Sequence, residues 1–223
     1  MRIRALFFDV DGLLLDTEKV YGYFWRKAGR EVGYTLDEEL VLELRSCDPS
    51  IARSLIDGKC DKGAYDRIRA KRKELMGNYF LLHDPEIKSG VIEFLNELES
   101  SYSYIDRIVV TQSPQKDKAE LLEKIGILDK FSNIISANDV KRVKPYPDIY
   151  QYASETIGYV PQECLAFEDS PNGVISAYKA NVNVVMIPEL SLPSETIKTM
   201  CIDVFENILE SLPLIRELAS KGE

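Results

Sequence analysis

The chain has 223 residues, of which 45% are hydrophobic and 29% charged, so it has enough apolar material for one large globular domain or two modest ones. Its formal net charge of −9 disfavours nucleic acid as a partner, because the phosphate backbone of nucleic acid is itself negative. No apolar run reaches the roughly 18 residues that a membrane span needs, and no secretory signal pattern is present, so we expect no membrane association and a cytoplasmic location.

Five short runs along the chain are rich in valine, isoleucine and phenylalanine. Strands that helices cover on both faces have this pattern, so each run predicts a buried strand of a parallel sheet. The runs span residues 3–8, 107–111, 133–137, 164–168 and 183–187. Stretches with apolar residues three and four positions apart predict helices between them, at 89–100, 114–126, 148–158 and 172–180. This alternation predicts an α/β fold with a doubly wound, Rossmann-like parallel sheet.

Residues 17–86 interrupt this alternation, because their stretches read as helices with no strand among them. The segment begins soon after the first strand and ends near Pro85, so we predict an all-helical cap above the carboxyl end of that strand. The predicted division is an α/β catalytic core of residues 1–16 and 87–223 and a helical cap of residues 17–86. A helical insertion at this place is a candidate lid.

Polar residues follow several of the predicted strands. In an open α/β sheet the ligand lies outside the carboxyl ends of the strands, so these residues are candidates for a site. They are Asp9 and Asp11 after the first strand, Thr111 and Gln112 at the end of the second, Lys144 in a loop after the third, and Glu168 and Asp169 at the end of the fourth.

Each of these residues also has an ordinary explanation. Asp11 precedes a glycine and is typical of a turn, and Thr111 and Ser113 precede a proline and could cap a helix. Lys144 alone would be a solvated loop residue, and residues 168–171 could simply begin a helix. Capping does not explain why all of them occur together, in this order and at these strand ends. The combination therefore favours one joint site.

As one site, these residue types suit phosphoryl transfer to a carboxylate. Asp9 would be the nucleophile, and Asp11 the acid and base for the leaving group and for water. A carboxylate that approaches a phosphate dianion is repelled, so cations must cancel the charge. Asp169 with Asp9, and also Glu168, offers the hard oxygen ligands that Mg²⁺ prefers. Lys144 supplies a second positive charge.

The remaining phosphoryl oxygens need hydrogen-bond donors. Thr111, Gln112 and Lys144 are the predicted phosphate-binding side chains, together with backbone amides after Asp11. Gly12 is predicted to bind phosphate through the backbone, because a glycine lets the chain turn while these amides stay free.

Four segments in this order, "DVDGLLLDTE", "VVTQS", "VKPYPDIY" and "FEDSPNG", resemble the motifs of the haloacid dehalogenase superfamily. The resemblance is to its β-phosphoglucomutase-like and phosphatase subgroup, whose helical cap follows the first motif. It implies that Asp9 forms an aspartyl-phosphate and that Asp11 is the acid and base, with its backbone carbonyl on Mg²⁺. It also implies that Thr111 and Lys144 bind phosphate. Glu168 and Asp169 would then belong to the Mg²⁺ site.

The cap departs from the mutases of that family. They carry an arginine after a Gly-x-Ser, whereas "LRSCDPSIAR" has Arg45 and Arg53 out of that register. We therefore expect a magnesium-dependent phosphatase that acts on a small phosphorylated metabolite such as a sugar or polyol phosphate. A phosphomutase remains the alternative. A receiver-like signalling protein is less favoured, because receivers lack the acid at the position of Asp11 and lack the cap.

Three further features receive a structural interpretation. Trp25 and its aromatic neighbours are expected in the core of the cap, with a face toward the substrate as the alternative. The segment 67–76 is expected to be a solvated helix face, and the alternative is that Lys71 or Lys73 reaches the substrate. Asn172 either supports the metal site or caps a helix.

Overall fold

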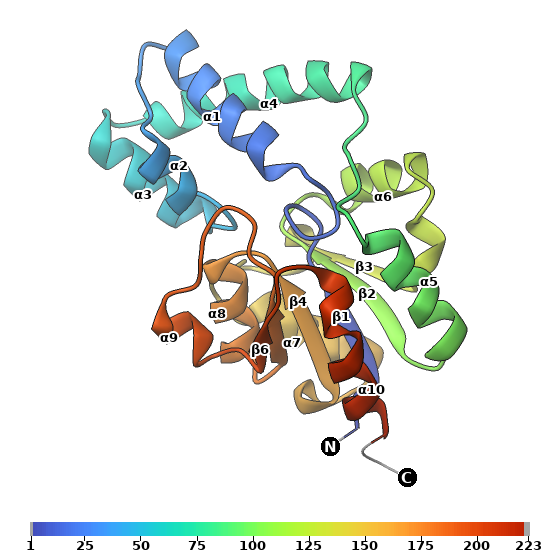
Figure 1. The fold of residues 1–223 in the computed structure, drawn as a ribbon. Coiled ribbons are helices and arrows are strands. Elements are labelled where there is room, and N and C mark those ends of the chain that lie inside the picture. The colour runs from blue at the N-terminus through green and yellow to red at the C-terminus, as the bar shows by residue number, and fades with distance from the viewer. Residues whose placement is uncertain (1, 221–223) are drawn as a thin grey trace.

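The computed structural model describes residues 2–220, and a parallel β-sheet lies at its centre (Figure 1). The strand order is β3-β2-β1-β4-β5-β6, and every pairing is parallel. The chain runs outward from β1 to β3 and then returns to β4 on the other side of β1, so the strand order reverses beside β1. The strands are β1 Ala5–Phe8, β2 Asp106–Thr111, β3 Asn133–Ser136, β4 Cys164–Glu168, β5 Asn183–Met186 and β6 Asp203–Val204.

Helices connect or follow the strands in the chain. They are α1 Glu18–Glu31, α2 Glu38–Glu43, α3 Pro49–Lys59, α4 Ala64–Leu82, α5 Val91–Ser101, α6 Gln115–Lys124, α7 Asp148–Ile157, α8 Pro171–Lys179, α9 Glu195–Lys198 and α10 Leu212–Ser220. The predicted fold class is confirmed, and the strands and helices predicted for the core agree with these bounds to within two residues. The two-residue strand β6 has no apolar run and was not predicted.

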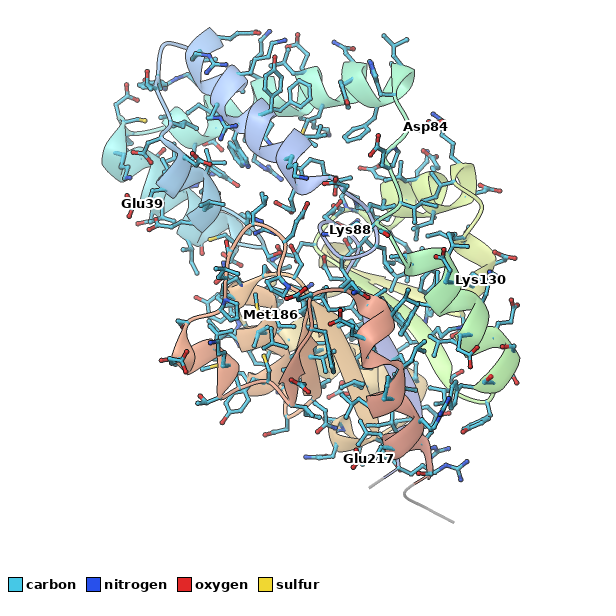
Figure 2. The ribbon with its side chains drawn as sticks, viewed as in Figure 1. Glu39, Asp84, Lys88, Lys130, Met186 and Glu217 are labelled. Carbon is cyan, nitrogen blue, oxygen red and sulfur yellow. The ribbon has the colours of Figure 1, made fainter. Side chains whose placement is uncertain are left out.

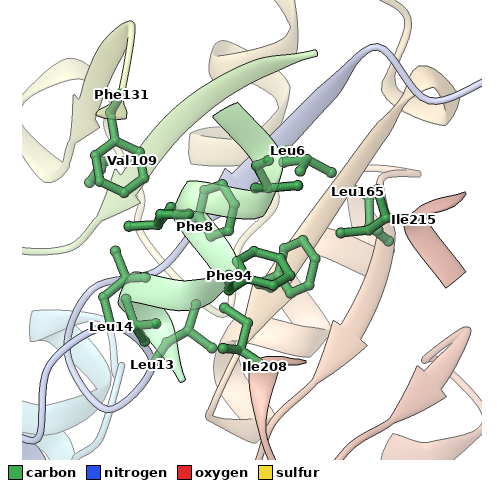
Figure 3. Close-up of a cluster of buried hydrophobic side chains, with 14 of the residues drawn as sticks. Leu6, Phe8, Leu13, Leu14, Phe94, Val109, Phe131, Leu165, Ile208 and Ile215 are labelled. Atoms are coloured by element: carbon green, nitrogen blue, oxygen red, sulfur yellow. The ribbon is translucent and has the colours of Figure 1, made fainter. Parts of the chain in front are cut away.

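The sheet is covered on both faces, as the continuous apolar strands require. On one face, Phe8 and its neighbours pack against Phe94 of α5 and Ile215 of α10 (Figure 3). Leu122 of α6 belongs to the same cluster. On the other face, the alternate strand residues pack against α7 and α8. The strands are therefore held rigidly between two helical layers.

Aromatic packing fixes the ends of the two central strands. Phe8 stacks on Phe167 with ring centroids 5.1 Å apart, and Phe94 meets Phe8 edge-on at 6.2 Å. Phe8 and Phe167 directly precede Asp9 and Glu168 in the chain. This aromatic packing therefore fixes the position of the backbone from which the Asp9 and Glu168 side chains extend.

Helices α1–α4, called the four-helix segment below, lie beyond the carboxyl end of β1 (Figure 1). They pack around an apolar cluster of their own, which includes Ala28, Leu40, Ile56 and Ile68. An all-helical insertion is therefore present between β1 and α5. The exact boundaries that we placed between core and cap stay a prediction.

The chain returns from the four-helix segment through residues that include Asp84 and Lys88 (Figure 2). This return runs beside the outgoing chain, because the backbone N–H of Asp16 donates to Glu86 O at 2.9 Å and that of Lys88 to Leu14 O at 3.0 Å. Among residues 2–220, no helix is long and apolar enough to cross a membrane. The cytoplasmic location stays a prediction.

Candidate active site

The predicted residues from the strand ends meet at one edge of the sheet. Asp9 follows β1, Thr111 ends β2 and Glu168 ends β4, with Asp169 next in the chain. All four side chains are buried. Because β1 pairs with both β2 and β4 in parallel register, their carboxyl ends lie side by side. The topology alone therefore brings these residues together.

Lys144 lies in the loop before α7 and is completely buried. Its Nζ is 2.5 Å from Oδ1 of Asp9 and 2.7 Å from Oε1 of Glu168, and it also donates to Val110 O at 3.3 Å. Burial acts to lower the pKa of this ammonium, but Asp9 and Glu168 outweigh it and raise the pKa. Lys144 is thus a fixed positive charge between two carboxylates, and not a solvated loop residue.

Three carboxylates form an acidic cluster. One oxygen each from Asp9, Glu168 and Asp169 lie within 4.8 Å of one another. Glu168 Oε1 accepts hydrogen bonds from Lys144 and from the hydroxyl of Tyr150. Oε2 of Glu168 and Oδ1 of Asp169 are buried without a hydrogen-bond partner. Buried carboxylate oxygens that lack a hydrogen-bond partner are suitable ligands for a divalent cation such as Mg²⁺.

The electrostatics of the acidic cluster also favour a bound cation. Burial raises the pKa of Glu168 to about 7 and that of Asp169 well above its usual range, and Lys144 or Arg45 offsets only part of the effect. Burial also raises the pKa of Asp9. Like charges in a buried site disfavour ionisation unless a cation is present. These residues are therefore suited to holding a metal ion.

Asp11 lies beside this cluster, but its carboxylate is not a member of it. Its Oδ1 accepts hydrogen bonds from Nζ of Lys118 at 2.5 Å, the Thr17 hydroxyl at 2.8 Å and the Tyr21 hydroxyl at 2.9 Å. Ser113 donates to Oδ2 at 3.3 Å. The side chain of Asp11 is thus an unsuitable metal ligand in this geometry, and only the backbone contact implied by the family resemblance stays a prediction.

The neighbours of Asp11 keep it ionised. Burial alone would raise its pKa, but the charge of Lys118 and the hydrogen bonds from Lys118, Thr17 and Tyr21 lower it. Lys118 is itself 2% exposed, and Asp11 raises its pKa. The ionised form of Asp11, which can accept a proton from water, is therefore the favoured one.

Thr111 and Ser113 do not cap α6, so the capping interpretation is wrong. The residue before α6 is Pro114, and the helix start has no side-chain cap. Thr111 Oγ1 instead accepts from the Ser113 backbone N–H at 3.2 Å, which leaves its own hydroxyl proton for another acceptor. The amide of Gln112 donates to Lys144 O at 3.1 Å, so one of its amide protons holds the loop that carries the buried lysine.

Gly12 has a φ of +88°, a left-handed conformation that favours glycine. A β-carbon at this position would also lie 2.2 Å from Oδ2 of Asp169. The Gly12 N–H donates to Leu15 O at 2.8 Å. This amide is therefore not available for phosphate, contrary to our expectation from the sequence. Gly12 therefore makes room for Asp169, and any phosphate contact must come from other amides of the turn.

Arg45 reaches the acidic cluster from the loop between α2 and α3. Its Nε is 2.9 Å from Oε2 of Glu18, and its Nη2 contacts Oδ2 of Asp169. Asn172 donates to the backbone carbonyl of Arg45 at 2.9 Å, so it contacts the four-helix segment and neither caps α8 nor enters the acidic cluster. Ser170 caps α8 instead. The four-helix segment thus supplies a cation to the site, whereas Arg53 pairs with Asp66 at the surface.

A cleft of about 340 Å³ lies between the sheet edge and the four-helix segment. Asp9, Asp11 and Gln112 line it from the sheet, and Trp25 and Arg72 are among the residues that line it from the helices. This volume suits a small ligand. Trp25 packs against the apolar cluster of the four-helix segment, as expected, and its face toward the cleft means that the alternative interpretation agrees with the structure as well. Lys71 pairs with Glu31 and Glu74 and is not among the lining residues.

Sequence reasoning missed several residues of this site, namely Thr17, Arg72 and Lys118, and it considered Tyr21 only as one of the aromatic neighbours of Trp25. A signal was available for two of them. Lys118 is four positions before the buried Leu122 of α6, and Arg72 is four positions after the buried Ile68 of α4. Each charged residue therefore lies on the apolar face of its helix, where a solvated residue is not expected.

Comparison with known proteins identifies the family. A family model described as haloacid dehalogenase-like hydrolase matches residues 6–187, and the chain belongs to this family. The family that we predicted from the four motifs is thus confirmed, and the protein is a hydrolase of that class. The matched range includes β1, the four-helix segment and the acidic cluster.

Relatives of known name cover most of the chain. Hexitol phosphatase A from Escherichia coli is 27% identical over 97% of this chain and 96% of its own length. A phosphorylated carbohydrates phosphatase from Thermotoga maritima is 28% identical over 81% of this chain and 82% of its own. Among solved structures, β-phosphoglucomutase from Clostridium difficile has a TM-score of 0.78 at 22% identity and covers 98% of both chains. This last likeness concerns the fold.

Proposed function

We propose that the protein is a magnesium-dependent phosphatase that hydrolyses a small phosphorylated metabolite through an aspartyl-phosphate on Asp9. The observation that carries the proposal is the environment of Asp9, which is buried at the end of β1 with Lys144 at 2.5 Å and two further carboxylates in the same acidic cluster. The phosphatase names of the Escherichia coli and Thermotoga maritima relatives support the reaction class. They also support a sugar or polyol phosphate as the substrate.

In the first step, the Asp9 carboxylate attacks phosphorus and the bond to the leaving oxygen breaks. The proton for that oxygen comes from Asp11 in its protonated form, which the charge of Lys118 makes the minor one. Lys144 stays charged and reduces the repulsion between the Asp9 carboxylate and the phosphate. The Thr111 hydroxyl has a free proton that can bind a phosphoryl oxygen.

In the second step, a water molecule attacks the phosphorus of the aspartyl-phosphate, Asp11 takes the water proton, and phosphate and free Asp9 result. The lowered pKa of Asp11 suits this base role. Asp9, Glu168 and Asp169 would hold Mg²⁺, which supplies positive charge to the phosphoryl group. The four-helix segment covers the cleft and would exclude bulk water during the reaction.

The test is release of phosphate from para-nitrophenyl phosphate with and without Mg²⁺, beside an Asp9→Asn variant. We expect wild type to depend on Mg²⁺ and the variant to lose more than about 1,000-fold in kcat, as nucleophile removal does in other enzymes. Equal activity of the two proteins would refute the mechanism. A panel of sugar phosphates then separates hydrolysis from the mutase alternative, which predicts isomerised product with little free phosphate.

A further inference from the structure

Arg72 of α4 is a cation without an anionic partner in the cleft above Asp9. The residue is half-buried, its Nε is removed from solvent, and among residues 2–220 no group forms a hydrogen bond or ion pair with it. Two aromatic rings flank it, since its guanidinium carbon lies 4.6 Å from the ring centroid of Trp25 and 5.1 Å from that of Tyr21. The guanidinium therefore retains donors for a ligand in the cleft.

The position of Arg72 relative to the reacting groups follows from Tyr21. The hydroxyl of Tyr21 is 2.9 Å from Oδ1 of Asp11, and the guanidinium of Arg72 lies over the face of the same ring. One tyrosine side chain thus separates the guanidinium from the acid and base. An anion at Arg72 and a phosphoryl group at Asp9 would be joined by a chain of only a few atoms.

A purely structural role does not account for this arrangement. Cation–π contacts with two rings offset part of the cost of removing a guanidinium from water, but they leave its planar N–H donors unused. Arg26 and Arg69 line the same cleft, and neither forms an ion pair with a described residue. Two acidic residues line the helical side, and of these Glu18 is already bound by Arg45, whereas Glu38 is outnumbered by the three arginines. The helical side of the cleft therefore has an excess of unpaired positive charge.

We propose that Arg72, held between Tyr21 and Trp25, forms a second anion-binding subsite, and that the substrate is a phosphate monoester with a further carboxylate or phosphate a few atoms from the reacting group. This inference rests on the proposed phosphatase function and narrows its substrate class. The planar guanidinium binds either anion through two parallel hydrogen bonds. The volume of about 340 Å³ accommodates a short-chain or single-sugar substrate.

The test compares substrates that differ only in the second charge. 3-Phosphoglycerate and glycerol 3-phosphate differ by a carboxylate in place of a hydroxymethyl group, and fructose 1,6-bisphosphate and fructose 1-phosphate differ by one phosphate. We expect wild type to prefer the charged member of at least one pair by about 10- to 100-fold in kcat/KM, mainly through KM. The pair with the larger preference identifies the anion.

Variants then assign the preference to Arg72. We expect Arg72→Gln to lose it, with kcat/KM for the charged member falling much further than that for the uncharged member, and Arg72→Lys to retain part of it. Lys73→Gln removes the same charge from an exposed neighbour on α4 and should leave the preference intact. Equal kcat/KM values within both pairs for wild type would overturn the proposal even if Arg72→Gln does not fold, and so would an equal loss on both members in that variant.

Trp25 gives a direct binding measurement, because it is the only tryptophan and contacts Arg72. In the inactive Asp9→Asn variant, 3-phosphoglycerate or fructose 1,6-bisphosphate should change its fluorescence at lower concentration than the uncharged partner does. Identical titrations would contradict the subsite. If no substrate releases phosphate and wild type equals Asp9→Asn, the proposed function itself fails, which is a different result from loss of charge preference alone.

Discussion

At the residue scale, the balance of charge around Asp11 determines which chemical role this side chain can fill. Four donors surround its carboxylate, and the closest is the buried ammonium of Lys118 at 2.5 Å. A general acid must carry a proton at the working pH, whereas these contacts favour the ionised form. Lys118 therefore favours proton transfer from water over proton transfer to the leaving group.

This balance can be tested by replacing Lys118 with methionine. Removal of the ammonium takes away the main interaction that lowers the pKa of Asp11, so the pKa must rise. Para-nitrophenolate leaves without a proton, so only the base form of Asp11 is needed with that substrate. For Lys118→Met we expect the acidic limb of the plot of kcat against pH to move to higher pH, so that the activity near pH 6 falls.

The matched control for this prediction is Lys116→Met. Lys116 is exposed on the same helix and pairs with Glu120 at 3.7 Å, far from Asp11 in its contacts, so its loss should leave the pH profile unchanged. An acidic limb of Lys118→Met that coincides with that of wild type would show that Asp11 does not set this limb.

At the element scale, strand ends could be predicted from the sequence, but the rotation of helices could not. The parallel sheet places the carboxyl ends of β1, β2 and β4 at one edge, so Asp9, Thr111 and Glu168 had to be neighbours once the strands were recognised. The contacts of Tyr21 and Lys118 with Asp11 depend instead on how α1 and α6 rotate and pack above the sheet. Sequence patterns indicate the apolar face of a helix but not the partner it meets.

The loop between α2 and α3 illustrates the same limit. Arg45 meets Asp169 across 124 residues of sequence, a contact that no local pattern encodes. In sequence Arg45 is only an arginine out of the register of the mutases, whereas the structure places it against the acidic cluster. Long-range ion pairs of this kind follow from tertiary packing alone.

The contact between Arg45 and Asp169 leads to a prediction about metal binding. A guanidinium and a divalent cation compete for the same carboxylate, and each repels the other. We expect Arg45→Met to bind Mg²⁺ about tenfold more tightly than wild type, in line with the loss of one charge–charge interaction at a partly screened site. Isothermal titration calorimetry at pH 8, where Glu168 with its pKa of about 7 is ionised, measures the affinity.

Arg53→Met is the control, because Arg53 pairs with Asp66 at the surface and should not affect Mg²⁺ binding. Weaker Mg²⁺ binding in Arg45→Met would contradict the prediction. Such a result would mean that Arg45 orients Asp169 for the metal and does not compete with it.

At the scale of the whole molecule, two apolar cores are joined through a polar site. The apolar cluster of the four-helix segment has no residue in common with the two clusters that cover the sheet. The contacts described between them are largely ionic or hydrogen-bonded, such as Tyr21 with Asp11, Arg45 with Asp169 and Asn172 with the Arg45 carbonyl. Polar contacts of this kind are replaced by water at lower cost than apolar packing is.

We therefore predict that the four-helix segment unfolds as a separate unit before the sheet does. Amides of α4 should exchange with a lower opening free energy, and with a smaller denaturant dependence, than amides of β1 and β4. Hydrogen exchange followed by mass spectrometry in increasing denaturant measures both quantities. Helix α7 is the internal control, because it packs on the sheet through Ile149 and Ala153 and should follow the strands. If α4, α7 and β1 exchange with one common free energy, the molecule is a single cooperative unit and the predicted division into core and cap is wrong.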